Sequence, residues 1–260
     1  MRPTSGIGIG RLGIALLSLG LIASAASADE PPKPPPVWSG KAEASYVATS
    51  GNSDAKTLGA AGEVAYVPGV WNFKLSLAFI RSESEGVETA RSFDGIVRAA
   101  RKLTPRLEIY VQGAYRENTF AGIDHQWSGD AGAAYQFLSG DPHSLKVQAG
   151  LGYLTEERLL PRVPPTAPQL TQTRSFAIAR VGLEYKWKFS KTGEFTEEAS
   201  FTEDLKESKD WRFADKVSLG ASVTTVFSVK LSYAWLTLNE PVLGKKKTDT
   251  ITSAALVAKF

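Results

Sequence analysis

The sequence contains no cysteine and only two histidines among its 260 residues. Without a thiol, the chain has no disulfide bond, no cysteine nucleophile and no cysteine-ligated metal. It also has no cysteine that could carry a lipid anchor behind a leader sequence. Histidine-based catalysis therefore has to be considered at very few positions.

Long apolar runs are also scarce. No later stretch approaches the length of about 20 residues that a membrane-spanning helix requires, so a helical membrane protein is not expected. The one apolar run, Leu12 to Ala23, follows two arginines and precedes the small-x-small sequence Ala26-Ser27-Ala28. We expect residues 1–28 to be a signal peptide that is cleaved before Asp29, with an uncleaved membrane anchor as the alternative.

An excess of charge of one sign is missing as well. The formal net charge is +3, and removal of the leader with its two arginines leaves 28 basic and 27 acidic residues. This balance gives no argument for nucleic acid as a partner, and we expect none.

Residues 29–37 follow the expected leader and contain the run Pro-Pro-Lys-Pro-Pro-Pro. Such a run is stiff and fully solvated, so we interpret this segment as a Pro-rich periplasmic linker. A peptide-docking role is the alternative.

Segments in which apolar and polar side chains alternate are frequent in this sequence. From Trp71 to Phe79, every second residue is large and apolar, and the residues between them are polar or small. Successive side chains of a β-strand point to opposite faces, so this segment has one apolar and one polar face. Similar segments recur up to the last residue, Phe260. Strands of this kind behind a secretory signal are typical of a transmembrane β-barrel.

We predict an all-β fold, a transmembrane antiparallel β-barrel of twelve strands over residues 38–260. The predicted strands are 38–49, 54–67, 71–79, 92–101, 107–116, 127–137, 145–153, 174–189, 194–202, 215–223, 227–235 and 250–260. The ninth carries Glu197 in its apolar row, which a β-bulge or a position outside the hydrocarbon would explain. Asp215 interrupts the outward row of the tenth strand, and we place it above the membrane.

The connections between the predicted strands alternate in length, as expected if every second one is a short periplasmic turn. The predicted short turns are 68–69, 104–105, 140–142, 190–193 and the reversal at residue 225. The predicted outer loops are 82–90, 117–124, 156–172, 204–210 and 239–249, whereas the first outer connection, 50–53, is short.

Aromatic residues gather near both predicted ends of the strands, where their amphipathic rings favour the level of the lipid headgroups. A soluble β-protein is the alternative explanation. Its outward rows would then form an exposed apolar band that is too large for a soluble monomer.

The start of the predicted barrel carries a recognisable pattern. Trp38-Ser-Gly-Lys-Ala-Glu-Ala is followed by Thr49-Ser-Gly-Asn-Ser-Asp54, and this opening resembles that of the YdiY-like family, called salt-induced outer-membrane proteins. The similarity covers residues 38–260, although only the first hairpin is distinctive. It implies an outer-membrane barrel with a domain of unknown function and no established activity.

Two chain segments suggest partners. Phe260, the last residue, resembles the terminal signal by which the outer-membrane assembly machinery recognises its barrel substrates. Lys245-Lys246-Lys247 lies in the last outer loop, where it is either solvated charge or a contact with lipopolysaccharide phosphates. In the first hairpin, Asn52 and Asp54 suit a tight turn, and a binding role is the alternative.

Residues with catalytic potential are few. His143 lies in a predicted periplasmic turn, and His125 shares the outward row with Trp127. Ser128 and Asp130 point inward, which argues against a His–Ser pair. We therefore predict no catalytic, cofactor-binding or metal-binding residues, and an enzyme that modifies outer-leaflet lipid is the alternative.

Adjacent carboxylates occur at Glu156-Glu157, Glu197-Glu198 and Glu203-Asp204. Neighbouring residues of a strand face opposite ways, so most such pairs cannot form a working acid–base pair. We interpret them as exposed loop charge.

The predicted inward rows contain charged residues of both signs. They are Asp94, Arg98, Glu108, Arg116, Asp130, Lys146, Arg180, Glu184, Lys186, Glu198, Lys216 and Lys230. If these side chains pair across the lumen they close it, and if they line it they leave a narrow channel with mild anion preference. The sequence does not choose, because partners across the lumen depend on how the strands are staggered.

We expect a protein of the Gram-negative outer membrane that is structural or forms a narrow channel for ions or small solutes. The family resemblance links it to salt or osmotic stress. A surface receptor or adhesin that uses the loops 156–172 and 239–249 is a further alternative. No cofactor is expected, and the oligomeric state is left open.

Overall fold

The computed structural model describes residues 37–49, 55–164 and 166–260. The predicted signal peptide 1–28, most of the linker 29–37 and the turn at residues 50–54 lie outside the described residues. Among the described residues, no helix is long and apolar enough to cross a membrane.

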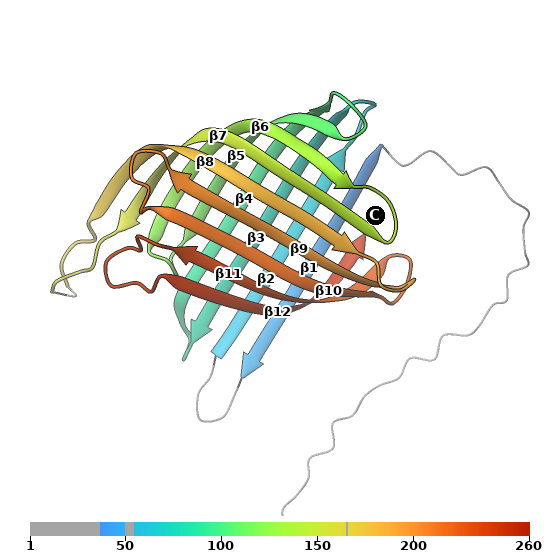
Figure 1. The fold of residues 1–260 in the computed structure, drawn as a ribbon. Coiled ribbons are helices and arrows are strands. Elements are labelled where there is room, and N and C mark those ends of the chain that lie inside the picture. Colours follow the sequence, from blue (N-terminus) through green and yellow to red (C-terminus); the bar gives the residue numbers. More distant parts are fainter. Residues whose placement is uncertain (1–36, 50–54, 165) are drawn as a thin grey trace, which may run out of the picture. The chain divides into compact units, whose positions relative to one another are not determined.

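Twelve antiparallel strands form one closed barrel (Figure 1), as the alternation of the sequence predicts. Each strand pairs with its neighbours in the sequence, and the last strand closes the ring against the first. The strands are β1 Trp38–Thr49, β2 Ala55–Tyr66, β3 Trp71–Ser84, β4 Val87–Lys102, β5 Leu107–Asn118, β6 Ile123–Leu138, β7 His143–Leu159, β8 Thr171–Trp187, β9 Gly193–Asp204, β10 Trp211–Ser222, β11 Phe227–Leu238 and β12 Thr248–Lys259.

The closing seam lies between β1 and β12. These strands pair only from Lys41 to Ala44 on β1, and two backbone hydrogen bonds between Gly40 and Phe260 (2.8 and 3.0 Å) extend the seam. The Phe260 ring lies over Gly40, where a Cβ atom would sit 2.3 Å from a ring carbon. Glycine at position 40 therefore makes room for the C-terminal ring.

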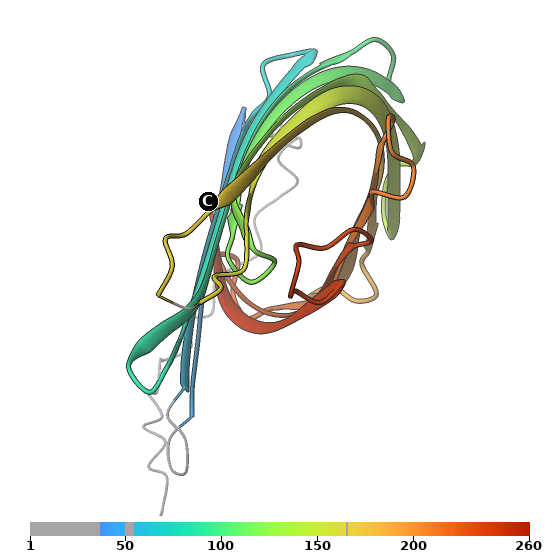
Figure 2. The same ribbon diagram turned by 90° about the vertical axis from the view of Figure 1, so that its left-hand side faces the viewer.

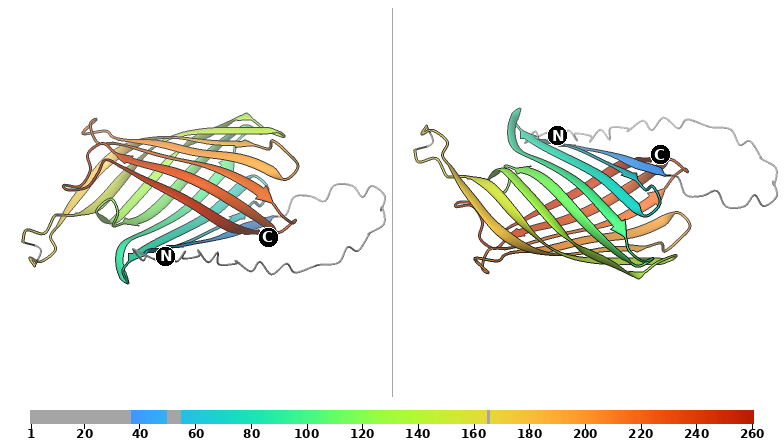
Figure 3. Two further views of the ribbon diagram at one scale, coloured as in Figure 1. Left: turned by 90° about the horizontal axis from the view of Figure 1, so that it is seen from below. Right: turned by 90° about the horizontal axis from the view of Figure 1, so that it is seen from above.

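The two ends of the barrel differ in their connections. At the short-turn end, the strands are joined by residues 67–70, 103–106, 139–142, 188–192 and 223–226. At the long-loop end, the described connections are 85–86, 119–122, 160–170, 205–210 and 239–247. Figure 3 shows that the loop after β7, in yellow, projects furthest from the strands at the long-loop end.

The prediction of a loop at residues 82–90 is wrong. Strands β3 and β4 extend into this range and are joined by the two-residue turn 85–86. Glu85 and Gly86 both have positive φ angles, 52° and 75°, which is the backbone of the tight hairpin turn that matches the twist of the strands. Several other strands also extend further toward the long-loop end than predicted, because their polar ends lack the apolar alternation used to find them.

The outward faces of the strands are apolar and exposed. On β3, Trp71, Leu75 and Leu77 expose 42%, 42% and 44% of their surface, while the residues between them are less exposed. Aromatic rings pair near both ends of the strands, for example Trp38 with Tyr66 at the short-turn end (centroids 4.3 Å apart). At the long-loop end, paired rings include those of Tyr115 and Trp127 (4.6 Å) and of Tyr233 and Trp235 (4.5 Å).

Glu197 interrupts the outward row of β9 without a bulge. Its register is regular on both sides, opposite Tyr185 of β8 and Val217 of β10. The bulge that the sequence suggested as an explanation is therefore absent from this described part of β9.

Candidate functional site

The inward face of the barrel carries most of the paired charge of the molecule. All but Glu198 and Lys216 of the twelve charged residues predicted to point inward form an ion pair within the described chain. Their partners come largely from other strands. The lumen is therefore lined by a network of fixed charges, which makes it the candidate functional site.

A cluster of three arginines and two carboxylates occupies the long-loop end of the lumen. The arginine–carboxylate cluster consists of Glu156, Arg158, Arg174, Asp210 and Arg212. Glu156 receives Arg158 Nε at 2.7 Å and Arg212 Nη1 at 2.7 Å, and Arg174 Nη1 lies 2.6 Å from Asp210. Neither carboxylate side chain exposes any surface, so both charges depend on these arginines.

Strand geometry explains why these side chains meet. Glu156 and Arg158 are two residues apart on β7 and share its inward face. Arg174 of β8 is the register partner of Glu156, and Arg212 reaches from β10 to Gln126 Oε1 of β6 at 2.9 Å. The cluster thus links the wall from β6 to β10.

The loop between β11 and β12 lies across this end of the barrel. Arg158 Nη1 donates to the backbone oxygen of Glu240 (3.0 Å), and Lys245 Nζ donates to the backbone oxygen of Thr119 (3.1 Å). Val242 is 3% exposed and packs against Gly122. Because β5 and β6 lie opposite β11 and β12 in the ring, these contacts require the loop to cross the opening, and Figure 2 shows the red loop inside the ring outline.

A second charged group lies on the wall formed by β4 to β8. Arg98 donates to Gln148 Oε1 at 2.7 Å and to Glu108 at 3.1 Å, and its guanidinium group lies 3.8 Å from the centre of the Tyr110 ring. Next to it, Arg180 Nη1 contacts Asp130 at 2.6 Å. The stacked guanidinium group of Arg98 and the ion pair of Arg180 with Asp130 therefore lie against the wall of the barrel.

Glycine at position 150 makes this arrangement possible. A Cβ atom there would lie 2.6 Å from the hydroxyl oxygen of Tyr110, and Tyr110 itself is 3% exposed. A side chain at this position would displace the ring and, with it, the stacked Arg98.

Charged side chains on the opposite side of the lumen, on β1, β2, β3 and β11, also form ion pairs. Lys230 of β11 contacts Glu43 of β1, and Glu63 of β2 lies between Lys74 (3.4 Å) and Lys41 (3.8 Å). Fixed charges of both signs therefore surround the lumen on all sides.

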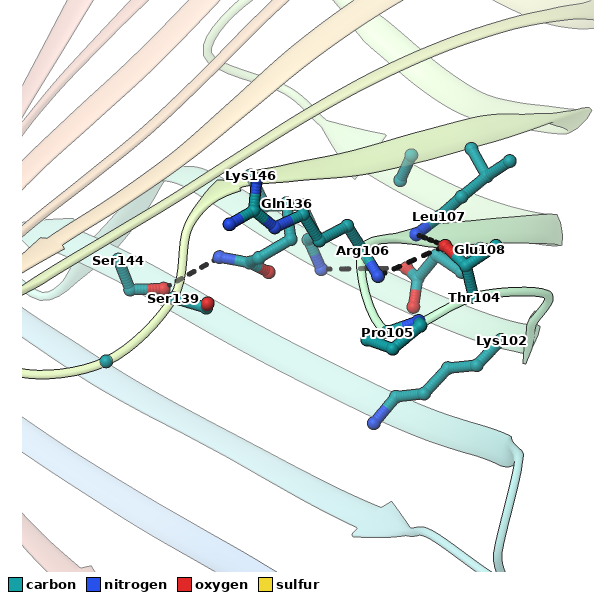
Figure 4. A pocket seen from close by; sticks show the side chains of 12 residues that line it. Lys102, Thr104, Pro105, Arg106, Leu107, Glu108, Gln136, Ser139, Ser144 and Lys146 are labelled. Atoms are coloured by element: carbon teal, nitrogen blue, oxygen red, sulfur yellow. Dashed lines mark hydrogen bonds and ion pairs between the residues drawn. The ribbon is translucent and has the colours of Figure 1, made fainter.

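A pocket of about 310 Å³ opens at the short-turn end of the lumen, between the β4–β5 and β6–β7 turns (Figure 4). Its lining residues are Lys102, Thr104, Pro105, Arg106, Leu107, Glu108, Ala134, Gln136, Ser139, Gly140, Ser144 and Lys146.

His125 lies where a β-bulge interrupts the pairing of β6 with β7. The register shifts between Ile123 and His125, so Asp124 and His125 both come close to Glu157. His125 Nδ1 is 3.4 Å from Asp124 and its Nε2 is 3.6 Å from Glu157. Among the described residues, this is the group of nitrogen and carboxylate ligands that could hold a metal ion.

Among the residues that the structure describes, neither histidine forms a hydrogen bond with a serine side chain. Ser128 and Asp130 are buried on the inward face of β6, as predicted, while Trp127 is exposed. The expected turn position of His143 is wrong, because His143 is the first residue of β7, where its Nδ1 lies 2.8 Å from the hydroxyl of Tyr185.

Sequence reasoning missed most of the arginine–carboxylate cluster. Exposed loop charge was expected at Glu156 and Asp204, but both are buried, with 0% and 3% of their surface exposed. The signal was available on β7, since counting every second residue onward from Gln148 leads to Glu156 and Arg158. No such pattern identifies Asp210, which lies in a loop.

Comparisons with known proteins add a family and distant structural similarities. The profile of the family described as a protein of unknown function, DUF481, matches residues 42–260, which is consistent with the YdiY-like resemblance. No curated protein matches the chain.

Solved structures that resemble the chain include two autotransporter domains and one outer membrane channel. The translocator domain of the autotransporter NalP from Neisseria meningitidis is 14% identical (TM-score 0.45), with 86% of this chain and 87% of that one covered. An outer membrane channel from Pseudomonas putida F1 is 8% identical (TM-score 0.49; 86% and 95% covered). The β domain of the Bordetella autotransporter BrkA is 9% identical (TM-score 0.42; 86% and 99% covered).

Proposed function

We propose that this chain, which belongs to the family described as a protein of unknown function, DUF481, forms a narrow, charge-lined channel for ions and small solutes in the outer membrane. The observation that carries this proposal is the combination of an exposed apolar outer wall with a lumen lined by fixed, paired charges.

The outer wall supports a membrane location. Apolar side chains such as Val97, Leu151 and Leu231 expose 61%, 65% and 60% of their surface, and they recur around the ring. An exposed apolar surface of this extent is unfavourable in water and favourable in hydrocarbon. Closure of the ring pairs the strand backbones, as a lipid environment requires.

The lumen supports a narrow channel rather than a wide pore. Long paired side chains lie along its walls, and the arginine–carboxylate cluster together with the β11–β12 loop constricts its long-loop end. Charges of both signs keep such a path hydrated, while their ion pairs limit its width.

Export and orientation complete the proposal. Residues 1–28 would direct the chain across the inner membrane, and Phe260 would be read by the assembly machinery. The short-turn end would then face the periplasm, and Lys245 to Lys247 would face lipopolysaccharide phosphates. A link to salt or osmotic stress is supported by the family resemblance alone.

Single-channel recording of the refolded protein, without residues 1–28, tests the channel. We expect discrete conductance steps in a planar bilayer that are small for a twelve-strand ring, because the long-loop end is constricted. The same preparation must show a folded barrel by circular dichroism and by heat-modifiable migration in gel electrophoresis. A folded barrel that gives no conductance over a range of voltages would refute the channel and leave a structural role.

A further inference from the structure

The pocket at the short-turn end has a charge that its own ion pairs do not balance. Three cationic side chains line it: Lys102, Arg106 and Lys146. Lys146 is paired with Glu184 at 3.1 Å, whereas Lys102 and Arg106 form no ion pair with any residue in the described part of the chain. Figure 4 shows Arg106 reaching from the β4–β5 turn toward Gln136, and in this view Lys102 lies on the other side of Pro105.

The acidic group in the pocket is already engaged. Glu108 accepts from Arg98 at 3.1 Å and lies 3.8 Å from Lys146. It therefore does not neutralise the two cations at the rim. The pocket therefore keeps an excess of positive charge, which two exposed side chains, Lys102 and Arg106, carry at its rim.

Neutral groups in the pocket are oriented for an anion as well. Gln136 Nε2 donates to the backbone oxygen of Leu138 (2.6 Å) and to Ser144 Oγ (3.0 Å). Since the Ser144 oxygen accepts this bond, its own proton is left to donate. Ser139 adds a second hydroxyl group to the lining.

A neighbouring recess of about 240 Å³ contains Lys186 and Lys188, but their charges are balanced. Lys186 lies 2.8 Å from Glu194, and Lys188 lies 2.8 Å from Asp141. Of these two recesses, the one lined by Lys102 and Arg106 is therefore the one with cations that lack an ion pair in the described part of the chain.

We propose that this pocket binds a small anion through carboxylate or phosphate oxygens, with Arg106 and Lys102 as the charged ligands and Ser144 as a neutral donor. A guanidinium group can engage two oxygens of such an anion at once, and the ammonium group adds a point charge. The volume of the pocket suits a small solute. This inference rests on the proposed channel, because the anion would reach the pocket through the lumen.

Binding can be measured without conduction. Inorganic phosphate is titrated with the refolded full barrel in a phosphate-free detergent, and the width of the phosphorus resonance reports binding. We expect the phosphorus resonance to broaden saturably as phosphate binds. If carboxylates share the site, added acetate should reduce the broadening. If the site is specific for phosphate, acetate should leave the broadening unchanged.

The test variant is Lys102→Gln/Arg106→Gln, and the matched control is Lys206→Gln/Lys209→Gln in the exposed β9–β10 loop. The test variant should bind phosphate at least about tenfold more weakly, because it loses two charge-assisted contacts. The control should bind like the unchanged protein. Equal binding by all three folded proteins, or no saturable binding by the unchanged protein, would overturn the proposal.

The binding and channel proposals fail separately. Phosphate binding by a barrel that gives no conductance would leave the anion site standing and remove the channel. Conductance by a barrel that does not broaden the phosphate resonance would support the channel and overturn the anion site.

Discussion

Glu156 and Asp210 show how the lumen tolerates buried charge. Each is enclosed by arginines, and three guanidinium groups share the two carboxylates. Removal of one partner from a buried ion pair leaves an uncompensated charge, which costs more than the pair itself contributes. The arginines would repel one another if one carboxylate were neutral.

The substitution Glu156→Gln keeps the shape of the side chain and removes its charge. We expect the free energy of unfolding to fall by about 3–5 kcal/mol, the usual cost of breaking a buried ion pair. Denaturant unfolding of the refolded barrel, followed by tryptophan fluorescence, measures this change. Glu207→Gln, in the exposed loop after β9, is the control, and equal midpoints for the two variants would contradict the prediction.

The sequence identifies individual residues of the lumen only in part. Strand parity finds Arg98, Asp130 and Arg180, because they lie inside predicted strands whose inward and outward rows can be counted, although the segment with Arg98 alternates more weakly than the others. It does not reveal that Arg98 contacts Gln148 on β7, since the partner depends on the stagger of strands around the ring. Strand parity does not single out Lys102 and Arg106, because Lys102 is the last residue of β4 and Arg106 lies in the turn that follows.

Among the elements, the strands were predicted well and their outer ends poorly. Alternation is strong where a strand has an apolar outer row, as in β3 and β11. It disappears toward the long-loop end, where β7 continues through Glu156 to Leu159 with a buried polar face. Hairpin length also escaped prediction at Glu85-Gly86, because a positive φ at a glutamate is not marked by its residue type.

The β11–β12 loop is the element that constricts the opening. Replacing residues 240–246 with two glycines removes Val242 and Lys245, which hold the loop against the β5–β6 connection. We expect larger single-channel conductance with the barrel still folded. The control is deletion of residues 162–169 from the loop after β7, which projects from the end of the barrel. A conductance that rises equally in both variants would argue against a constricting role for the β11–β12 loop.

At the scale of the whole molecule, the ring is uneven in how firmly its strands are joined. β7 pairs with β8 over His143 to Leu159, whereas β1 pairs with β12 only over Lys41 to Ala44. Local opening begins where the fewest backbone hydrogen bonds must break.

Hydrogen exchange followed by mass spectrometry should resolve this difference. We expect amides of β12 and of the β1 segment near Ala44 to exchange faster than those of β7 and β8. Exchange that is uniform around the ring, or slowest at the β1–β12 seam, would contradict the prediction.

The same seam has a consequence for how the barrel is made. It joins the first and the last strand of the barrel, so we expect its closure to carry the greatest loop-closure entropy cost and to come late in folding. Until then the protein is a curved sheet with two bare edges, and bare edges are not tolerated in hydrocarbon. We therefore expect a nascent barrel of this chain to require a temporary partner for its edge strands. A seam of only four paired positions in the described chain would let such a partner be displaced easily.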